Sequence, residues 1–144
     1  MTLEQISIFI ENKAGSLEEV CRVLADGDIN LRALSVADTQ DFGILRILVE
    51  NTEKAVEILK NNGYICKTNE VIAVEIPDKP GGMADIMSIV SVPEVSVEYA
   101  YAFATHKEND SAYMIFRVSG TEKAVELLKA AGIESFSKEE LFKK

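Results

Sequence analysis

An internal repeat is the feature that most constrains the fold of this chain. Residues 52–63 read TEKAVEILKNNG and residues 121–132 read TEKAVELLKAAG, so nine of the twelve positions are identical at a shift of 69 residues. Upstream, residues 8–17 match residues 74–83 at a shift of 66. Two blocks that recur in the same order predict two copies of one structural module. The second copy then carries three extra residues, which we place in the polar stretch His106–Ser111.

The first copy predicts a β-α-β-β-α-β order of elements. Alternating Ile6, Ile8 and Ile10 indicate a half-buried strand. Ser16 and Glu19 have the spacing of a capping box. We predict strands at Glu4–Ile10, Ile29–Asp38, Gly43–Glu50 and Tyr64–Thr68, and helices that Ser16 and Thr52 cap and that Gly27 and Gly63 end.

The second copy predicts the same order, without a Gly-, Ser- or Pro-rich linker before it. This order is the split βαβ pattern of ferredoxin-like folds. The sequence therefore predicts an α+β protein with two tandem ferredoxin-like βαββαβ modules side by side, at residues 1–69 and 70–144, paired about a pseudo-two-fold axis. The predicted elements of the second copy are strands at Val71–Ile76, Val95–Ala104, Ala112–Val118 and Ile133–Phe136, a helix over Met83–Val90, a helix capped by Thr121 and a short helix in Ser137–Lys144.

Charge and composition argue against several classes of partner. The chain has 144 residues and a net charge of −9, and acidic proteins repel phosphate backbones and anionic lipid. No apolar run approaches the roughly 20 residues of a membrane span. Residues 1–5 lack the basic and apolar regions of a signal peptide. Cys21 and Cys66 form no CxxC motif, so we expect reduced thiols in a cytoplasmic protein. From the acidic charge and the absence of a long apolar run, we expect the protein to bind neither nucleic acid nor membrane.

Catalytic and metal-binding patterns are weak. His106 is the only histidine, and its neighbours Lys107 and Glu108 indicate a solvated hairpin tip. No P-loop, GxSxG or HExxH motif occurs. We therefore expect no catalytic residue, no metal and no cofactor. A stripe of Val97, Tyr99, Tyr101 and Phe103 faces one side of a strand whose other side is also apolar, so one side is expected to pack on another module or chain.

Two strand-turn-helix segments carry a resemblance to a known family. Asp78-Lys79-Pro80-Gly81-Gly82-Met83 and its twin Asn12-Lys13-Ala14-Gly15-Ser16-Leu17, together with Ile29-Asn30-Leu31, resemble the ACT domain. The resemblance covers nearly the whole chain as two ACT modules in tandem. It implies a regulatory, non-enzymatic protein that binds a small free amino acid at an interface between modules, and association as a homodimer.

The residues of these turns suit such a ligand. A turn that opens a helix presents free N–H groups and the positive end of the helix dipole, which suit a carboxylate. An asparagine offers both a donor and an acceptor. The copies differ, because Ser96 stands where the first copy has Asn30, so two sites would not be equivalent. The predicted ligand-binding residues are Asn12, Ala14, Gly15, Ser16, Leu17, Asn30, Leu31, Asp78, Pro80, Gly81, Gly82 and Met83.

Two other functions remain open from the sequence. A ligand-free structural adaptor would use the same surfaces to pair with a metabolic enzyme. A small enzyme with an unrecognised site is the third hypothesis, and it lacks any nucleophile–base or metal pattern. The sequence does not indicate which amino acid would bind.

Overall fold

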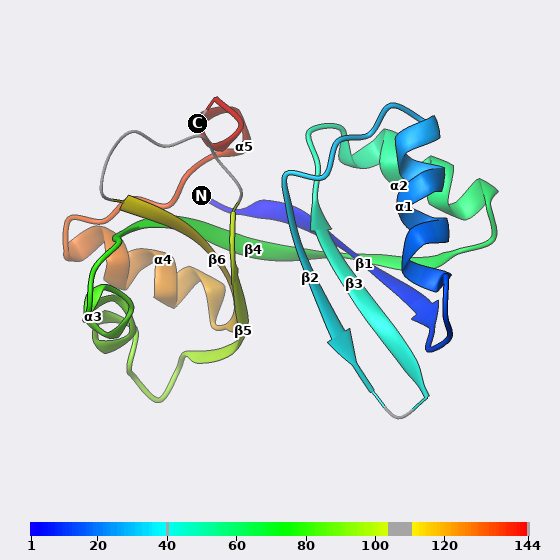
Figure 1. The fold of residues 1–144 in the computed structure, drawn as a ribbon. Coiled ribbons are helices and arrows are strands. Elements are labelled where there is room, and N and C mark those ends of the chain that lie inside the picture. The colour runs from blue at the N-terminus through cyan, green and yellow to red at the C-terminus, as the bar shows by residue number, and fades with distance from the viewer. Residues whose placement is uncertain (40, 104–110, 144) are drawn as a thin grey trace. The chain divides into compact units, whose positions relative to one another are not determined.

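The computed structural model describes residues 1–39, 41–103 and 111–143, so His106 and most of the stretch predicted to hold the insertion lie outside it. The chain forms two compact units (Figure 1). The N-terminal unit is Glu4–Asn69, and the C-terminal unit combines Met1–Leu3 with Glu70–Lys144. The predicted α+β, ferredoxin-like class is confirmed, since the helices and antiparallel strands follow the expected order with two exceptions: one continuous strand, Ile65–Pro77, replaces the two strands predicted at Tyr64–Thr68 and Val71–Ile76, and the last predicted strand is absent. The module boundaries and the pseudo-two-fold pairing stay predictions.

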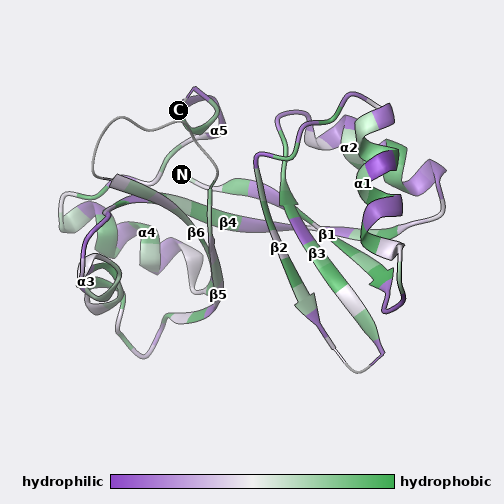
Figure 2. Ribbon diagram, viewed as in Figure 1, coloured by the Kyte–Doolittle hydropathy of each residue, from purple (hydrophilic) through white to green (hydrophobic). Residues whose placement is uncertain are grey.

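The N-terminal unit contains β1 (Leu3–Glu11), α1 (Ser16–Asp26), β2 (Ala33–Asp38), β3 (Phe42–Leu48), α2 (Thr52–Asn61) and the start of β4 (Ile65–Pro77). β3 lies between β1 and β2 and is antiparallel to both, with Leu45 opposite Ile8 on one side and Val36 on the other. The predicted alternation of β1 is confirmed, because its isoleucines pack with the inner faces of both helices (Figure 2). The core of this unit comprises Ile6, Ile8, Ile10, Val20, Leu24, Ile29, Leu45, Ile47, Val49, Ala55 and Leu59.

The C-terminal unit contains the rest of β4, then α3 (Gly82–Ile89), β5 (Ser96–Ala102), β6 (Ser111–Ser119), α4 (Thr121–Ala130) and α5 (Lys138–Leu141). β6 lies between β4 and β5, with Val74 opposite Met114 and Ala100 opposite Phe116. The register of β5 shifts between Val97 and Tyr99. The core under α3 and α4 includes Ile72, Val74, Ile76, Ile86, Val90, Val95, Phe116, Val118, Ala124 and Leu128.

Tyr99, Tyr101 and Phe103 of the predicted aromatic stripe lie on the sheet face turned away from α3 and α4, whereas the register shift pairs Val97 with Val118 of the core on the helix side, so the prediction of Val97 on this face is wrong. Ala100 packs against the core below those helices, which places its neighbours Tyr99 and Tyr101 on the opposite face, where their rings stack at 6.5 Å. The C-terminal segment of the same chain contributes to this face: Phe103 contacts Phe142 at 5.8 Å between ring centroids. The stripe thus forms part of a second apolar layer, and its own chain supplies some of the cover.

The two helices that follow the hairpins begin one residue from the predicted caps. Asn51 is the N-cap of α2, and its side chain accepts a hydrogen bond from the Lys54 amide at 3.1 Å, so the assignment of Thr52 is wrong. Gly120 in a left-handed conformation precedes α4 without any side-chain cap, so Thr121 is the first helical residue. Sequence spacing cannot separate adjacent polar residues that are both good caps.

Two predicted strands are shorter or absent. The Ile29 amide donates to the Leu24 carbonyl at 2.9 Å and so still closes α1, which is why β2 begins only at Ala33. In the second copy, Ile133–Phe136 forms no strand. Phe136 donates to the Ala73 carbonyl at 2.9 Å, but this bond is not extended into a ladder.

Candidate functional site

The predicted strand-turn-helix corners are present at matching places in both units. Gly15 at the start of α1 has φ = 88° and Gly81 at the start of α3 has φ = 90°, a left-handed conformation that glycine adopts without strain. A side-chain cap requires an extended N-cap residue. The predicted capping box of Ser16 and Glu19 is therefore wrong, since Gly15 occupies the cap position and no side chain caps α1.

Both corners are open above the glycine. A Cβ atom added to Gly15 or to Gly81 would meet no other atom within 4 Å. The amides in the first turn of a helix have no intrahelical acceptor, and the helix dipole adds a partial positive charge there. The turns themselves use one amide at each corner, since Ser16 donates to the Lys13 carbonyl at 3.3 Å and Gly82 donates to the Lys79 carbonyl at 3.0 Å. Leu17 beside the first corner is 41 % exposed, while Met83 beside the second packs against the core. Each corner is thus chemically suited to a carboxylate with a modest apolar neighbour.

The C-terminal corner is built more tightly than its twin. Gly82 is buried, and a Cβ atom there would collide with the Pro77 carbonyl oxygen. Its counterpart Ser16 carries a Cβ and is 8 % exposed. Lys79 also folds back, with its amide donating to the Pro77 carbonyl at 3.0 Å. Asp78, Pro80 and Gly81 are all exposed around this turn.

Asn12 has a structural task in the N-terminal corner. Its side-chain Nδ2 donates to the Thr39 carbonyl at 2.8 Å, which ties the corner to the turn between β2 and β3. The same turn is closed by the Thr39 amide donating to the Phe42 carbonyl at 2.9 Å. Ala14 is exposed next to Gly15 and provides no polar group. A ligand at this corner would have to compete with the Thr39 carbonyl for the Asn12 Nδ2 donor, or bind the Asn12 side-chain oxygen alone.

Asn30 and Leu31 lie at the other end of α1 from Gly15. The helix has 11 residues, which corresponds to about 16 Å at 1.5 Å per residue. Asn30 is exposed, whereas Leu31 packs against the core of the unit. One unit therefore does not bring the corner and Asn30 together. A site that uses both needs a second module or a second chain, and their joint role stays a prediction.

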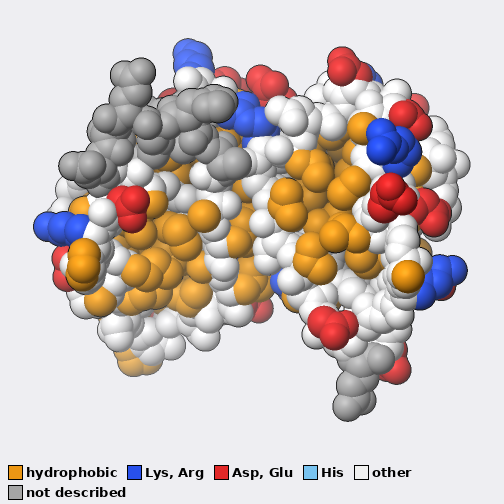
Figure 3. Space-filling view, viewed as in Figure 1, with side chains coloured by type: hydrophobic (Ala, Val, Ile, Leu, Met, Phe, Trp, Pro, Cys, Tyr) orange, Lys and Arg blue, Asp and Glu red, His pale blue; other side chains and the backbone are white. Residues whose placement is uncertain are grey.

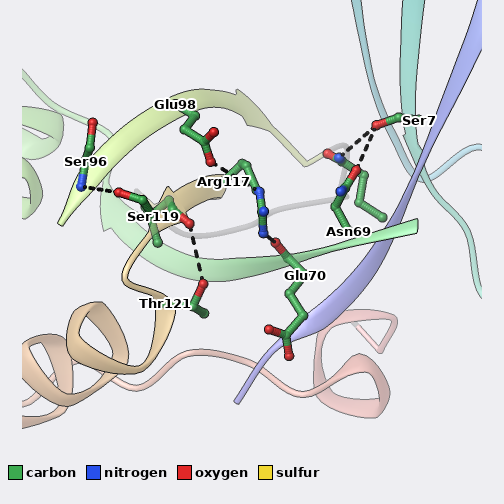
Figure 4. Close-up of polar contacts among 10 residues, drawn as sticks. Ser7, Asn69, Glu70, Ser96, Glu98, Arg117, Ser119 and Thr121 are labelled. Carbon is green, nitrogen blue, oxygen red and sulfur yellow. Dashed lines mark hydrogen bonds and ion pairs between the residues drawn. The ribbon is translucent and has the colours of Figure 1, made fainter. Parts of the chain in front are cut away.

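Ser96, the counterpart of Asn30, contributes its backbone amide to a polar cluster on the C-terminal sheet (Figure 4). The Ser96 amide donates to Ser119 Oγ at 3.1 Å. Nearby, Arg117 on β6 donates through Nη1 to the Glu70 carbonyl at 2.8 Å and pairs with Glu98 on β5 at 3.3 Å. These contacts join three strands, so we interpret the cluster as structural.

Each unit also contains a cavity at the end of its sheet, and the repeat relates the two. The N-terminal cavity has a volume of about 420 Å³ and the C-terminal cavity about 780 Å³. Ile10 and Gly63 line the first, and their repeat counterparts Ile76 and Gly132 line the second. Of the predicted ligand-binding residues, Ser16 alone lines either cavity within the described part of the chain.

The N-terminal cavity contains a hydrogen-bonded tyrosine. The Tyr64 hydroxyl donates to Glu19 Oε1 at 3.1 Å. Burial raises the pKa of Tyr64 above its usual value, and the hydrogen bond to Glu19 and the negative charge of that carboxylate raise the pKa further. At the mouth, Lys13 pairs with Glu11 at 3.1 Å, with both side chains mostly exposed. The sequence analysis missed Tyr64 because it lies 45 residues from Glu19.

The residues that the structure describes include neither a metal-binding cluster nor a membrane-spanning helix. They contain no group of three or more His, Cys, Asp or Glu side chains placed to hold a metal ion. None of their helices is long and apolar enough to cross a membrane. The chemistry on view is that of backbone amides, carboxylates and apolar side chains.

Two α+β modules with matching glycine corners define a tandem ferredoxin-like fold, and comparison with known proteins identifies the family. The profile of the family described as "ACT domain pair" matches residues 1–144. The chain belongs to this family, as the sequence analysis predicted. Protein BT0572 from Bacteroides thetaiotaomicron is 38% identical, with a TM-score of 0.89, over 100% of this chain and 98% of that one.

More distant structures share the fold. The regulatory subunit of aspartate kinase from Thermus thermophilus is 16% identical with a TM-score of 0.64, over 91% of this chain and 95% of that one. The same subunit from Thermus flavus is 17% identical with a TM-score of 0.63, over 90% and 92%. No curated protein sequence matches the chain significantly. At these identities the likeness shows the fold, and it shows no shared ligand.

Proposed function

We propose that this chain is a non-catalytic regulatory protein that binds a free amino acid at its ACT corners. The observation that carries the proposal is the pair of matched corners, where Gly15 and Gly81 hold the same left-handed conformation under open space. Open amides at a helix start recognise a carboxylate. Since the net charge of −9 gives no general attraction for anions, recognition has to be local.

The proposed ligand contacts follow the sequence prediction. The carboxylate would meet amides near Gly15–Leu17 or Gly81–Met83. Asn30 of a neighbouring module, or Asp78 at the exposed C-terminal turn, would meet the polar groups of the ligand. The two corners differ in tightness at Gly82 and Ser16, which supports unequal affinities at the two places.

A thermal-shift screen of the twenty amino acids, followed by calorimetry, tests this proposal. Asn30→Ala removes one or two hydrogen bonds worth about 0.5–1.5 kcal/mol each, so affinity should fall by about threefold to a hundredfold. Asp78→Ala and Gly81→Val test the C-terminal corner in the same assay. Glu126→Gln, at an exposed position on α4, is the control and should bind like wild type. Absence of binding at millimolar concentration would refute the proposal.

The alternative function is a ligand-free adaptor that pairs with a metabolic enzyme. Leu34 and Val36 on β2 are each 49 % exposed, and apolar side chains gather over β2 and β3 (Figure 3). Exposed apolar patches of this kind are typical of protein contacts. The same surface supports a homodimer, which we also propose. We further propose that the protein is cytoplasmic. Sedimentation at micromolar concentration should show more than a monomer for wild type, and Leu34→Glu should shift the distribution toward the monomer.

A further inference from the structure

The N-terminal cavity has an apolar rim that the protein leaves unfilled. Phe9 and Phe42 meet edge to face at 5.4 Å between ring centroids, and both line the cavity. Phe42 is 37 % exposed, and Ile65, which also lines the cavity, is 70 % exposed. Every residue that lines this cavity belongs to the N-terminal unit. The rim therefore offers apolar surface that a ligand would remove from water, which is favourable in proportion to the area covered.

The repeat provides an internal comparison for this rim. In the C-terminal cavity, Glu75 stands in place of Phe9, Ser111 in place of Phe42 and Glu134 in place of Ile65, and all three line it. The wall residue Tyr64 is replaced by Ile133, so the hydroxyl contact with Glu19 has no equivalent there. The two cavities thus share a position in the module but differ in chemistry: the apolar residues at positions 9, 42 and 65 of the N-terminal cavity are replaced by polar or acidic ones, while Ile76, Ile133 and Phe136 still give the C-terminal cavity apolar walls.

The polar wall matches the charges of an amino acid. Glu19, Asp41, Tyr64 and Lys13 all line the N-terminal cavity. A carboxylate accepts several hydrogen bonds, so Glu19 can hold the Tyr64 hydroxyl and a ligand ammonium together. The exposed Glu11–Lys13 pair contributes little by itself, which leaves Lys13 free to turn toward a ligand carboxylate. The volume of about 420 Å³ lies within the usual range of roughly 300–1,000 Å³ for small-molecule sites.

We infer that the N-terminal cavity binds α-amino acids with large apolar side chains, at one per chain. The apolar side chain packs on Phe9, Phe42 and Ile65, and the ammonium meets Glu19. This inference rests on the proposed function of amino-acid binding, but it places the ligand in the cavity beside the Gly15 corner, which shares Ser16 with that corner, instead of on the corner amides. It is independent of any contribution from Asn30.

Calorimetry with defined probes tests the inference. L-phenylalanine and L-leucine should bind the full chain with a stoichiometry of one at this cavity, whereas L-serine and L-aspartate should bind at least tenfold more weakly. Phe42→Ser and Ile65→Glu each install the residue of the other repeat, and Ile65 is the more exposed of the two positions. Each should weaken L-phenylalanine about tenfold or more, which corresponds to roughly 1.4 kcal/mol. Ser111→Ala in the other cavity is the matched control and should bind like wild type.

Ligand fragments separate the ammonium contact from the apolar one. Glu19→Gln should weaken L-phenylalanine and phenethylamine and leave 3-phenylpropionate, which has no ammonium, unchanged. If an amino acid binds but Phe42→Ser and Ile65→Glu bind it like wild type, while Asn30→Ala or Gly81→Val does not, the inference is wrong and the proposed function stands. If none of the twenty amino acids binds, the proposed function fails and the inference with it.

Discussion

Replacing Gly82 by alanine is a direct test of how tightly the C-terminal corner is built. A Cβ atom there would overlap the Pro77 carbonyl oxygen and lie 3.2 Å from the Pro77 carbonyl carbon. That carbonyl accepts the Lys79 amide at 3.0 Å, so it cannot retreat without losing a hydrogen bond of the turn. Gly82 itself is helical, and it is absent from the residues with positive φ. The cost of the substitution is therefore steric.

The magnitude follows from the cost of overpacking a buried site, which is about 1–3 kcal/mol. With a value of about 2 kcal/mol and a urea m-value of about 2 kcal/mol/M, the unfolding midpoint should fall by about 1 M. Tyrosine fluorescence reports the transition, because the chain has no tryptophan. Tyr99, Tyr101 and Tyr113 all belong to the C-terminal unit, where the substitution lies.

Ser16→Ala is the matched control, since Ser16 occupies the same repeat position and its Cβ is already accommodated. Its hydroxyl does not cap α1, so the free energy of unfolding should change by less than about 0.5 kcal/mol. A Gly82→Ala protein that unfolds at the wild-type urea concentration would show that the corner relaxes freely, and the steric reasoning would be refuted.

Three further predictions concern a helix cap and two ionisable groups. Asn51→Ala should lower the free energy of unfolding by about 1 kcal/mol in urea titrations, because it removes the side-chain cap of α2. Glu19→Gln should lower the pKa of Tyr64, seen as tyrosinate absorbance, while burial keeps it above the usual value of about 10. Since the folded-state pKa of Tyr64 is raised, its contribution to stability is present below that usual value and is lost as the pH rises through the folded pKa. Burial raises the pKa of the Cys66 thiol, and the positive charge of Lys60 lowers it in part. Lys60→Gln should therefore raise the pKa of this thiol further and slow its alkylation at mildly alkaline pH. Faster alkylation of the variant would contradict this reasoning.

The repeat made the order of elements and both glycine corners predictable. Gly63 and Gly132 were both in the repeated block, and the structure places each in a left-handed conformation just after its helix, with φ = 82°. The residues at which helices and strands begin and end were harder to predict from the sequence. The backbone of Asp28 is left-handed, with φ = 61°, in the turn that follows α1. No local pattern predicted this turn, and because of it β2 begins only at Ala33.

The candidate site was predictable only in part. A short motif such as the Gly15 corner can be read locally, because its geometry depends on adjacent residues. The N-terminal cavity depends on Phe9 of β1, Phe42 of β3 and Tyr64 in the turn before β4, which come together only in the folded unit. The mismatch between the repeats at Phe42 and Ser111 was visible in the sequence, but its meaning required the knowledge that both positions line cavities.

The 13-residue strand β4 restricts the insertions and deletions that this chain can accept, because its side chains alternate between two faces. Cys66, near its start, packs against the core of the N-terminal unit, and Ile72, Val74 and Ile76 enter the core of the C-terminal unit, so the inward positions of both units are even-numbered. Side chains of a strand alternate with a period of two. Within the C-terminal unit, inserting or deleting one residue in the stretch 72–76 would turn part of this core set to the other face of the strand, whereas a change of two residues would keep the alternation. The repeats can diverge by substitution, but a change in the length of a paired strand keeps its inward side chains inward only in steps of two residues.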